Sequence, residues 1–142
     1  MMTRTEVLEG VRECLAVALD VDPGTIADGA KLIEDLGADS LDLLDLTFQL
    51  EQRFSIRISP RDIERDARRR LGEVPLEIDG VYTPEALAEL RRAMPEVPEE
   101  ELAEGLHQGE LPYRFRVATM VNLVCRLMDE QHGGDGQVQD DA

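Results

Sequence analysis

The sequence is poor in positive charge, and above all in lysine. Its 142 residues include 31 Asp and Glu against 15 Lys and Arg, and Lys31 is the single lysine, so the formal net charge is −16. Nucleic acids and anionic membranes present dense phosphate charge, which proteins bind through clustered cations. The composition therefore argues against both ligands, and the excess of acid indicates either a protein partner with a basic surface or only solubility.

Aromatic residues are also scarce. They make up 4% of the chain, and tryptophan is absent. The core must therefore be aliphatic, and a hydrophobic content of 42% at this length is sufficient to build one. Such a core suits helices packed through Leu, Val and Ala, so the predicted fold class is all-α.

Long apolar runs are absent as well. No stretch approaches the roughly 18 apolar residues of a membrane span, and no apolar run follows the charged N-terminus as it would in a signal peptide. Cys14 and Cys125 are the only cysteines, and in a chain able to build a core they are expected to be reduced and buried. We therefore expect a cytoplasmic monomer with no membrane span.

Apolar spacing predicts the first two helices. One should cover 5–19 behind a capping box at Thr3, and the next should begin at Asp39 or Ser40 and end near residue 53. The loop between these helices runs to about Ala38. Loops this long are uncommon in compact domains unless they are functional or are held to the core by buried side chains. Four apolar residues indicate pinning, namely Ile26, Leu32, Ile33 and Leu36.

A third helix is predicted after Ser59, which should cap it. Pro60 should take the first helical position, Asp62 should complete the cap, and Gly72 should end the helix. This segment holds the one basic cluster of the chain, which consists of Arg61, Arg65, Arg68, Arg69 and Arg70.

The remaining elements are shorter until the last. Residues 73–83 should be extended around an Asp-Gly turn, 84–94 should form a short helix, and 99–109 should form a helical piece that ends before Pro112. The last helix, at 115–131, is apolar nearly all round and should therefore lie at the centre of the core.

The string Gly37-Ala38-Asp39-Ser40-Leu41-Asp42 places a serine at the start of an acidic amphipathic helix, after a glycine turn. A helix N-terminus offers free N–H groups and a partial positive charge, so a phosphate on Ser40 is tolerated there. The position is accessible to another enzyme, and Asp39 offers that enzyme a contact. Taken alone, the residues also fit a simple helix cap.

Over Asp35 to Asp42 this sequence resembles the acyl carrier proteins, the stand-alone carriers of type II fatty-acid and polyketide synthesis. The resemblance implies a four-helix bundle. Residues 69–113 have no counterpart in an ordinary carrier, and their regular apolar residues predict an inserted, mostly helical small lobe. The predicted domains are an acyl-carrier-like bundle at 1–68 plus 114–131, an inserted lobe at 69–113 and a disordered acidic tail at 132–142.

The resemblance also implies a function without catalysis. A phosphopantetheinyl transferase would attach a 4′-phosphopantetheine arm from coenzyme A to Ser40, and the arm would carry acyl groups as thioesters. Leu44 and Phe48, under the second helix, would line the space that shelters the acyl chain, unless they are ordinary core. Recognition by the transferase, and by acyl-transferring or acyl-modifying enzymes with basic docking patches, would rest on Asp39, Leu41, Asp42, Asp45 and Glu51.

Other functions have less support. Ser40 does not lie in a Gly-x-Ser-x-Gly elbow, and neither His107 nor His132 has a second ligand at metal spacing, so we expect no catalytic or metal site. The alternative to the carrier is an unmodified, carrier-like interaction module that binds a basic partner through the acidic helix. The inserted lobe is predicted to be ordered, and it would cover the acyl pocket, dock one dedicated enzyme or only stabilise the bundle.

Overall fold

The computed structural model describes residues 2–59 and 61–133. The chain divides into two compact units, which we call unit 1 (Met1–Ile58 with Arg116–Ala142) and unit 2 (Ser59–Phe115). Nearly all regular structure in the described residues is helical, which confirms the predicted all-α class. In this part of the chain, no helix is long and apolar enough to cross a membrane.

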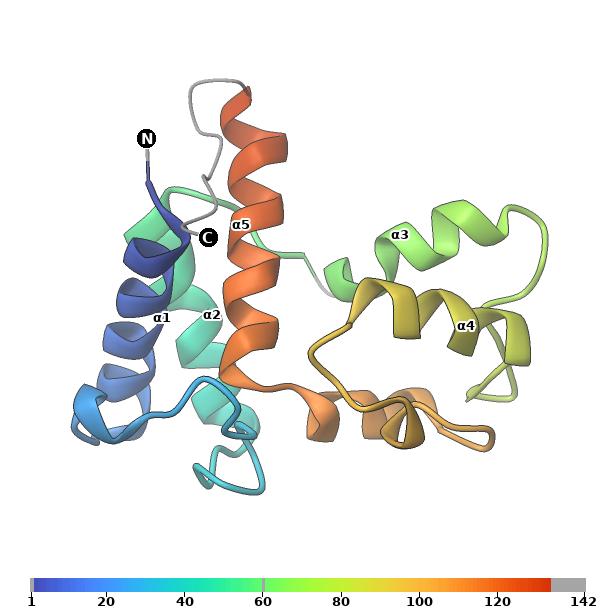
Figure 1. The fold of residues 1–142 in the computed structure, drawn as a ribbon, viewed down its shortest axis with the longest axis horizontal. Coiled ribbons are helices and arrows are strands. Elements are labelled where there is room, and N and C mark those ends of the chain that lie inside the picture. The colour runs from blue at the N-terminus through green and yellow to red at the C-terminus, as the bar shows by residue number, and fades with distance from the viewer. Residues whose placement is uncertain (1, 60, 134–142) are drawn as a thin grey trace. The chain divides into compact units, whose positions relative to one another are not determined.

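Unit 1 is built on three helices that lie side by side (Figure 1). They are α1 (Arg4–Leu19), α2 (Ser40–Phe54) and α5 (Val117–His132), with a short 3₁₀ turn η1 (Pro23–Thr25) between the first two. The predicted capping box of α1 is present, because Thr3 and Glu6 each accept a hydrogen bond from the other's backbone N–H. Helix α1 packs on both α2 and α5, so the three helices enclose one aliphatic core.

The core position predicted for the last helix is confirmed. Helix α5 buries eight of its 16 residues, and these are Val117, Thr119, Met120, Val121, Leu123, Val124, Leu127 and Met128. Helix α1 meets them with Val7, Val11 and Leu15, which are at most 1% exposed. Such aliphatic burial contributes about 1.5–3 kcal/mol for each large side chain.

Helix α5 extends to His132, so the predicted tail begins too early. The ring of His132 hydrogen-bonds the Ser55 carbonyl at 2.8 Å, and the amide of Gln131 both accepts from the N–H of Arg57 and donates to its carbonyl. These bonds anchor the last turn to the segment after α2. The rest of the predicted tail, 134–142, lies outside the described residues.

The two cysteines are free and differ in burial. Cys14 is buried as predicted, and its burial raises the pKa of its thiol. Cys125 is only half-buried, contrary to the prediction, and its sulfur lies 3.9 Å from Nη1 of Arg4.

Unit 2, whose helices α3 (Asp62–Leu71) and α4 (Pro84–Ala93) are labelled in Figure 1, has a hydrophobic core of its own. Its other elements are β1 (Glu77–Ile78), β2 (Val81–Tyr82), η2 (Glu99–Glu101) and η3 (Gln108–Arg114). The core comprises Ala67, Leu76, Tyr82, Ala86, Leu87, Leu90, Met94, Val97, Leu102, Leu106 and Leu111. Two apolar residues of the predicted lobe, Ile78 and Val81, are exposed and lie outside this core.

Unit 2 begins at Ser59, whereas the sequence placed 59–68 with the bundle. The reason is the apolar face of α3, since Ala67 belongs to the core of unit 2 and Ile63 and Leu71 pack against it. The predicted start of α3 is also wrong. Arg61, not Ser59, is the N-cap, in a left-handed conformation and without a side-chain hydrogen bond that caps the helix, while Pro60 lies outside the described residues.

The extended segment in unit 2 is confirmed as a two-stranded hairpin. Asp79 and Gly80 both have positive φ, as a type I′ turn requires. The His107 ring covers this turn, and a Cβ on Gly80 would lie 2.4 Å from its Nε2. The helical piece predicted for 99–109 is replaced by two 3₁₀ segments, η2 and η3, and η3 runs through Pro112 to Arg114 instead of ending before it.

Replacing Gly10 by alanine is expected to destabilise unit 1. Gly10 lies under the buried ring of Phe54, and a Cβ there would be 2.6 Å from Phe54 Cζ. We expect this overlap to outweigh the higher helix propensity of alanine and to lower the free energy of unfolding by about 1 kcal/mol in urea denaturation.

Gly29→Ala is the matched control, because a Cβ at Gly29 meets nothing within 4 Å. The control should change stability by no more than about 0.5 kcal/mol. Equal stability of the two variants would show that the Phe54 ring moves aside without cost.

Candidate functional site

The loop between η1 and α2 is pinned at both sides, as its apolar anchors predicted. Ile26 and Leu32 are at most 2% exposed. The start of α5 donates two backbone hydrogen bonds to the loop, from Val117 to the Ala30 carbonyl and from Ala118 to the Asp28 carbonyl, each of 3.0 Å. The loop therefore has a defined course up to the first turn of α2.

The last residues of the loop form a tight, hydrogen-bonded turn. The Asp35 carboxylate accepts a hydrogen bond from the Lys31 N–H at 2.8 Å, and the Ala38 N–H donates to the Leu32 carbonyl. Gly37 has a φ of 74°, which a glycine adopts without strain. This turn delivers the chain to Asp39 at the start of α2.

Asp39 and Asp42 form a reciprocal capping box. The Asp39 carboxylate accepts from the Asp42 N–H at 2.8 Å, and the Asp42 carboxylate accepts from the Asp39 N–H at 3.0 Å. Asp39 is therefore the N-cap, and Ser40 is the first helical residue. The simple capping role considered for Ser40 belongs to its neighbour.

Ser40 is exposed at the N-terminus of α2. The free N–H groups of this first turn give it a partial positive charge. A phosphodiester oxygen attached there would meet a favourable potential and would be open to solvent. The residues present thus fit a covalent, phosphate-linked group on the serine hydroxyl.

The outer face of α2 is apolar and exposed. Leu41, Leu44 and Phe48 are 75%, 67% and 57% exposed. They line a shallow hollow of about 490 Å³ together with Asp45, Thr47 and Glu51. Exposed apolar surface on a helix is typical of sites that contact another molecule.

The position predicted for Leu44 and Phe48 beneath α2 is wrong. Leu46, Leu50 and Phe54 form the buried face of the helix, and each is at most 3% exposed. Helix α2 has apolar residues on two opposite sides, so spacing alone did not reveal which side packs on α1. Leu44 and Phe48 lie on the side that faces solvent.

The structure separates the predicted recognition residues into two groups. Asp39 and Asp42 form the cap of α2, while Leu41, Asp45 and Glu51 line the hollow. Of the acidic residues, Asp45 is exposed, whereas Glu51 also accepts a hydrogen bond from the Ile58 N–H at 2.9 Å. Thr47 was missed, although its position three residues after Leu44 places it on the same face.

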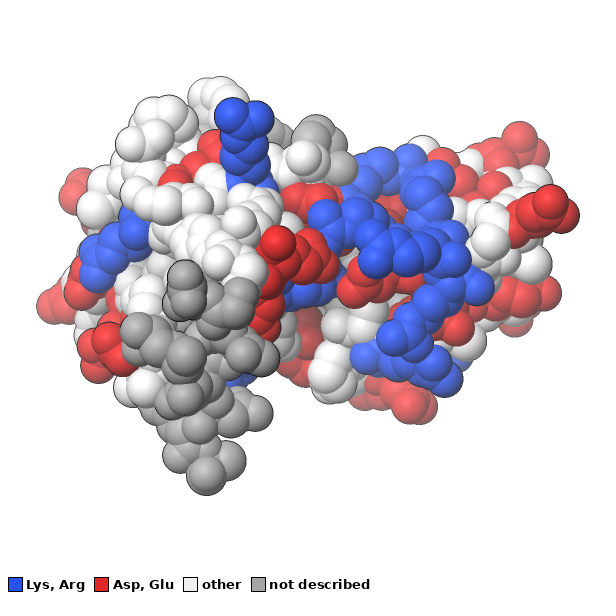
Figure 2. Space-filling view, turned by 90° about the horizontal axis from the view of Figure 1, so that it is seen from above, with Lys and Arg blue, Asp and Glu red and all other residues white. Residues whose placement is uncertain are grey.

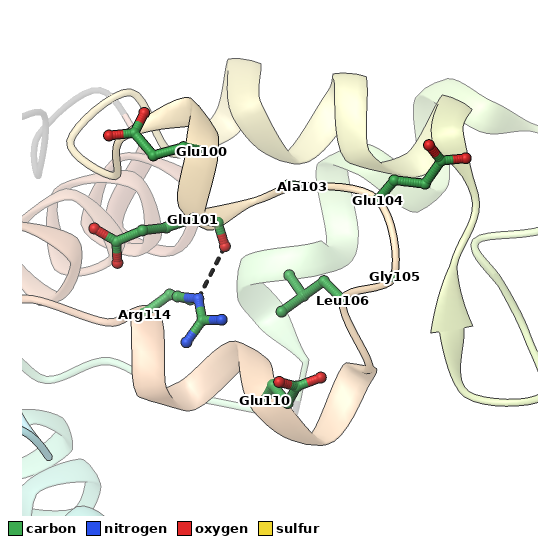
Figure 3. A pocket seen from close by; sticks show the side chains of 8 residues that line it. All are labelled: Glu100, Glu101, Ala103, Glu104, Gly105, Leu106, Glu110 and Arg114. Atoms are coloured by element: carbon green, nitrogen blue, oxygen red, sulfur yellow. Dashed lines mark hydrogen bonds between the residues drawn. The ribbon is translucent and has the colours of Figure 1, made fainter.

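A second pocket, of about 230 Å³, lies in unit 2 (Figure 3). Arg114 points into it and donates from Nε to the Glu101 carbonyl at 2.8 Å. The Glu100 and Glu104 carboxylates point away from each other on opposite sides. Among the described residues, no three His, Cys, Asp or Glu side chains are grouped to hold a metal ion.

Comparison with known proteins points to one family. The family described as "Phosphopantetheine attachment site" matches residues 9–69. The acyl carrier protein of Thermotoga maritima is 40% identical over 65 residues, which are 46% of this chain and 80% of that protein. Those of Campylobacter concisus and Thermosynechococcus vestitus are 42% and 39% identical over 59 and 64 residues, covering 42% and 45% of this chain and 77% and 79% of their own lengths.

Replacement of the cap should loosen the turn that carries Ser40. Asp39→Ala removes the acceptor for the Asp42 N–H, and we expect unfolding free energy to fall by about 0.5–2 kcal/mol. Asp39→Asn retains an oxygen acceptor and should lose less. Hydrogen exchange at the amides of the first turn measures the local effect, and equal protection in both variants would contradict it.

Proposed function

The chain belongs to the acyl carrier protein family, and we propose that it carries acyl groups as thioesters on an arm attached to Ser40. The cofactor of the family is a covalently attached 4′-phosphopantetheine group. One observation carries the assignment to Ser40. This serine is exposed at the first position of α2, and because Asp39 supplies the cap, its hydroxyl is not committed to holding the helix.

The surroundings of Ser40 suit both attachment and later use of the arm. A phosphopantetheinyl transferase would join the serine oxygen to the phosphate of the arm as a phosphodiester. The helix N-terminus stabilises the remaining negative charge, and the capping box holds the serine at one position. When bound, the arm supplies the thiol that forms the thioester.

The outer face of α2 is proposed to be the docking surface for partner enzymes. Its apolar residues Leu41, Leu44 and Phe48 can enter the contact, while Asp45 and Glu51 meet basic patches on the partner. Opposite charges at the rim speed the encounter and allow rapid release. The partners would be enzymes of fatty-acid, polyketide or specialised lipid metabolism.

The chain is proposed to act as a carrier and not as an enzyme, since its relatives are carriers. Reactivity would reside in the thiol of the arm. We also propose that it works in the cytoplasm, where its two free cysteines would stay reduced.

Modification of Ser40 is the first test. Incubation with coenzyme A and a broad-specificity phosphopantetheinyl transferase should add the mass of one arm, as intact-mass spectrometry would show. Ser40→Ala should gain nothing, and Ser59→Ala, which alters an exposed serine of unit 2, should gain one arm. No gain in wild-type protein with several transferases, combined with retained binding of a basic partner, would favour the unmodified interaction module.

The docking surface is tested by truncating its largest side chain. Phe48→Ala should slow modification by the transferase by about tenfold, because a large exposed aromatic side chain acts as an anchor in a contact. Val17→Ala is the control, since Val17 is similarly exposed on α1. The measurement is the initial rate of modification of each variant, followed by mass spectrometry. Equal slowing in Phe48→Ala and Val17→Ala would argue against a special role for α2.

A further inference from the structure

The charges of α3 are sorted by side. Of its three acidic residues, Asp62 and Glu64 are only 7% and 6% exposed, while the side chain of the third, Asp66, is 33% exposed. Asp62 accepts a hydrogen bond from the Ser59 N–H at 2.6 Å, and Glu64 pairs with Arg61 at 2.7 Å. With these carboxylates turned inward, the outward charge of the helix is set by its arginines.

The arginines of this segment are exposed at their tips. The side chains of Arg61, Arg69 and Arg70 are 40%, 70% and 52% exposed, and Arg68 is also exposed. We call Arg61, Arg65, Arg68, Arg69 and Arg70 the arginine face. Figure 2 shows Lys and Arg atoms gathered over this part of unit 2, where every basic residue is an arginine.

Two ion pairs of this face are long, whereas Arg61 is held closely by Glu64 at 2.7 Å and by Glu77 at 2.8 Å. Arg69 with Asp66 and Arg70 with Glu89 are each 3.9 Å apart. Surface pairs at such distances contribute between zero and about 1 kcal/mol. A partner that offers well-placed carboxylates can therefore replace them at little cost.

The helix dipole explains only half of this arrangement. Cations in the last turn are favourable, which accounts for Arg68, Arg69 and Arg70. Arg61 and Arg65 lie at the first turn, where a cation is unfavourable. Arg61 needs both Glu64 and Glu77, at 2.7 and 2.8 Å, to hold it there. A positive face along the whole helix therefore calls for a reason beyond helix stability.

The charge of unit 2 as a whole selects the kind of partner. Residues 59–115 hold fourteen acidic residues against eight arginines, a net charge of −6. A polyanion such as nucleic acid or an anionic membrane would be repelled by most of this unit. A short acidic segment on a protein feels only the local face, because charges beyond about 8 Å are screened at physiological salt.

We propose that the arginine face of α3 binds a carboxylate-rich segment of a partner protein. Guanidinium groups pair with carboxylates through two parallel hydrogen bonds, which gives both strength and orientation. The face has the opposite sign to the acidic rim of α2. A partner with a carboxylate-rich segment is thereby distinguished from enzymes that carry only basic patches, which α3 would not bind.

The test uses the full chain and a fluorescent helical peptide of alanine with glutamates at i and i+4 spacing, at about 0.05 M salt. The probe should bind wild-type protein, as measured by fluorescence anisotropy. Arg68→Gln with Arg69→Gln should weaken binding by about tenfold. Arg53→Gln with Arg57→Gln is the matched control, because it removes two exposed arginines from unit 1, and it should change affinity by less than about twofold.

Three results would overturn the proposal. The first is equal weakening in the two double variants, and the second is equal binding of a peptide with glutamine in place of glutamate. The third is tighter binding of duplex DNA, or of phosphatidylcholine vesicles containing phosphatidylserine, because a phosphate partner would then be favoured. Ser40→Ala protein should bind the peptide as wild type does, so failure here is distinct from failure of the carrier function.

Discussion

The reciprocal capping box of Asp39 and Asp42 is the constraint on which the site depends. It sets the first residue of α2, and so decides that Ser40 is exposed at the positive end of the helix. The box holds its place because the preceding loop is bonded to the start of α5 and anchored by buried Leu32. A shift of α2 by one residue would rotate its faces by about 100° and bury the serine side.

This same register gives α2 its two apolar faces. Leu46, Leu50 and Phe54 pack inward, and Gly10 of α1 lets the Phe54 ring approach closely. Leu41, Leu44 and Phe48 then must face solvent, although leaving them there forgoes about 1.5–3 kcal/mol of burial for each. Stability of the isolated chain does not explain such exposure, which accords with the proposed docking of partner enzymes on this face.

Local signals predicted most of the fold. Caps at Thr3 and Thr83, the Asp79-Gly80 turn and the periodicity of α1, α2 and α5 depend on near neighbours, and each element formed where these residues placed it. The errors share a different origin. The exposed side of α2, the packing of α3 on α4 and the contact of His132 with Ser55 are decided by residues distant in sequence, which spacing cannot report.

The inserted segment determines what α3 packs against. The family match ends at residue 69, within this helix, yet the core of unit 2 takes up its apolar face. The remaining sides of α3 carry charged residues. Because Asp62 and Glu64 are buried, arginines provide most of the exposed charge. The chain therefore carries two surfaces of opposite sign, the acidic rim of α2 and the arginine face of α3. Partner choice can therefore depend on two separate charge matches, one to the acidic rim of α2 and one to the arginine face of α3. Two such requirements discriminate between partners better than a single surface of higher charge.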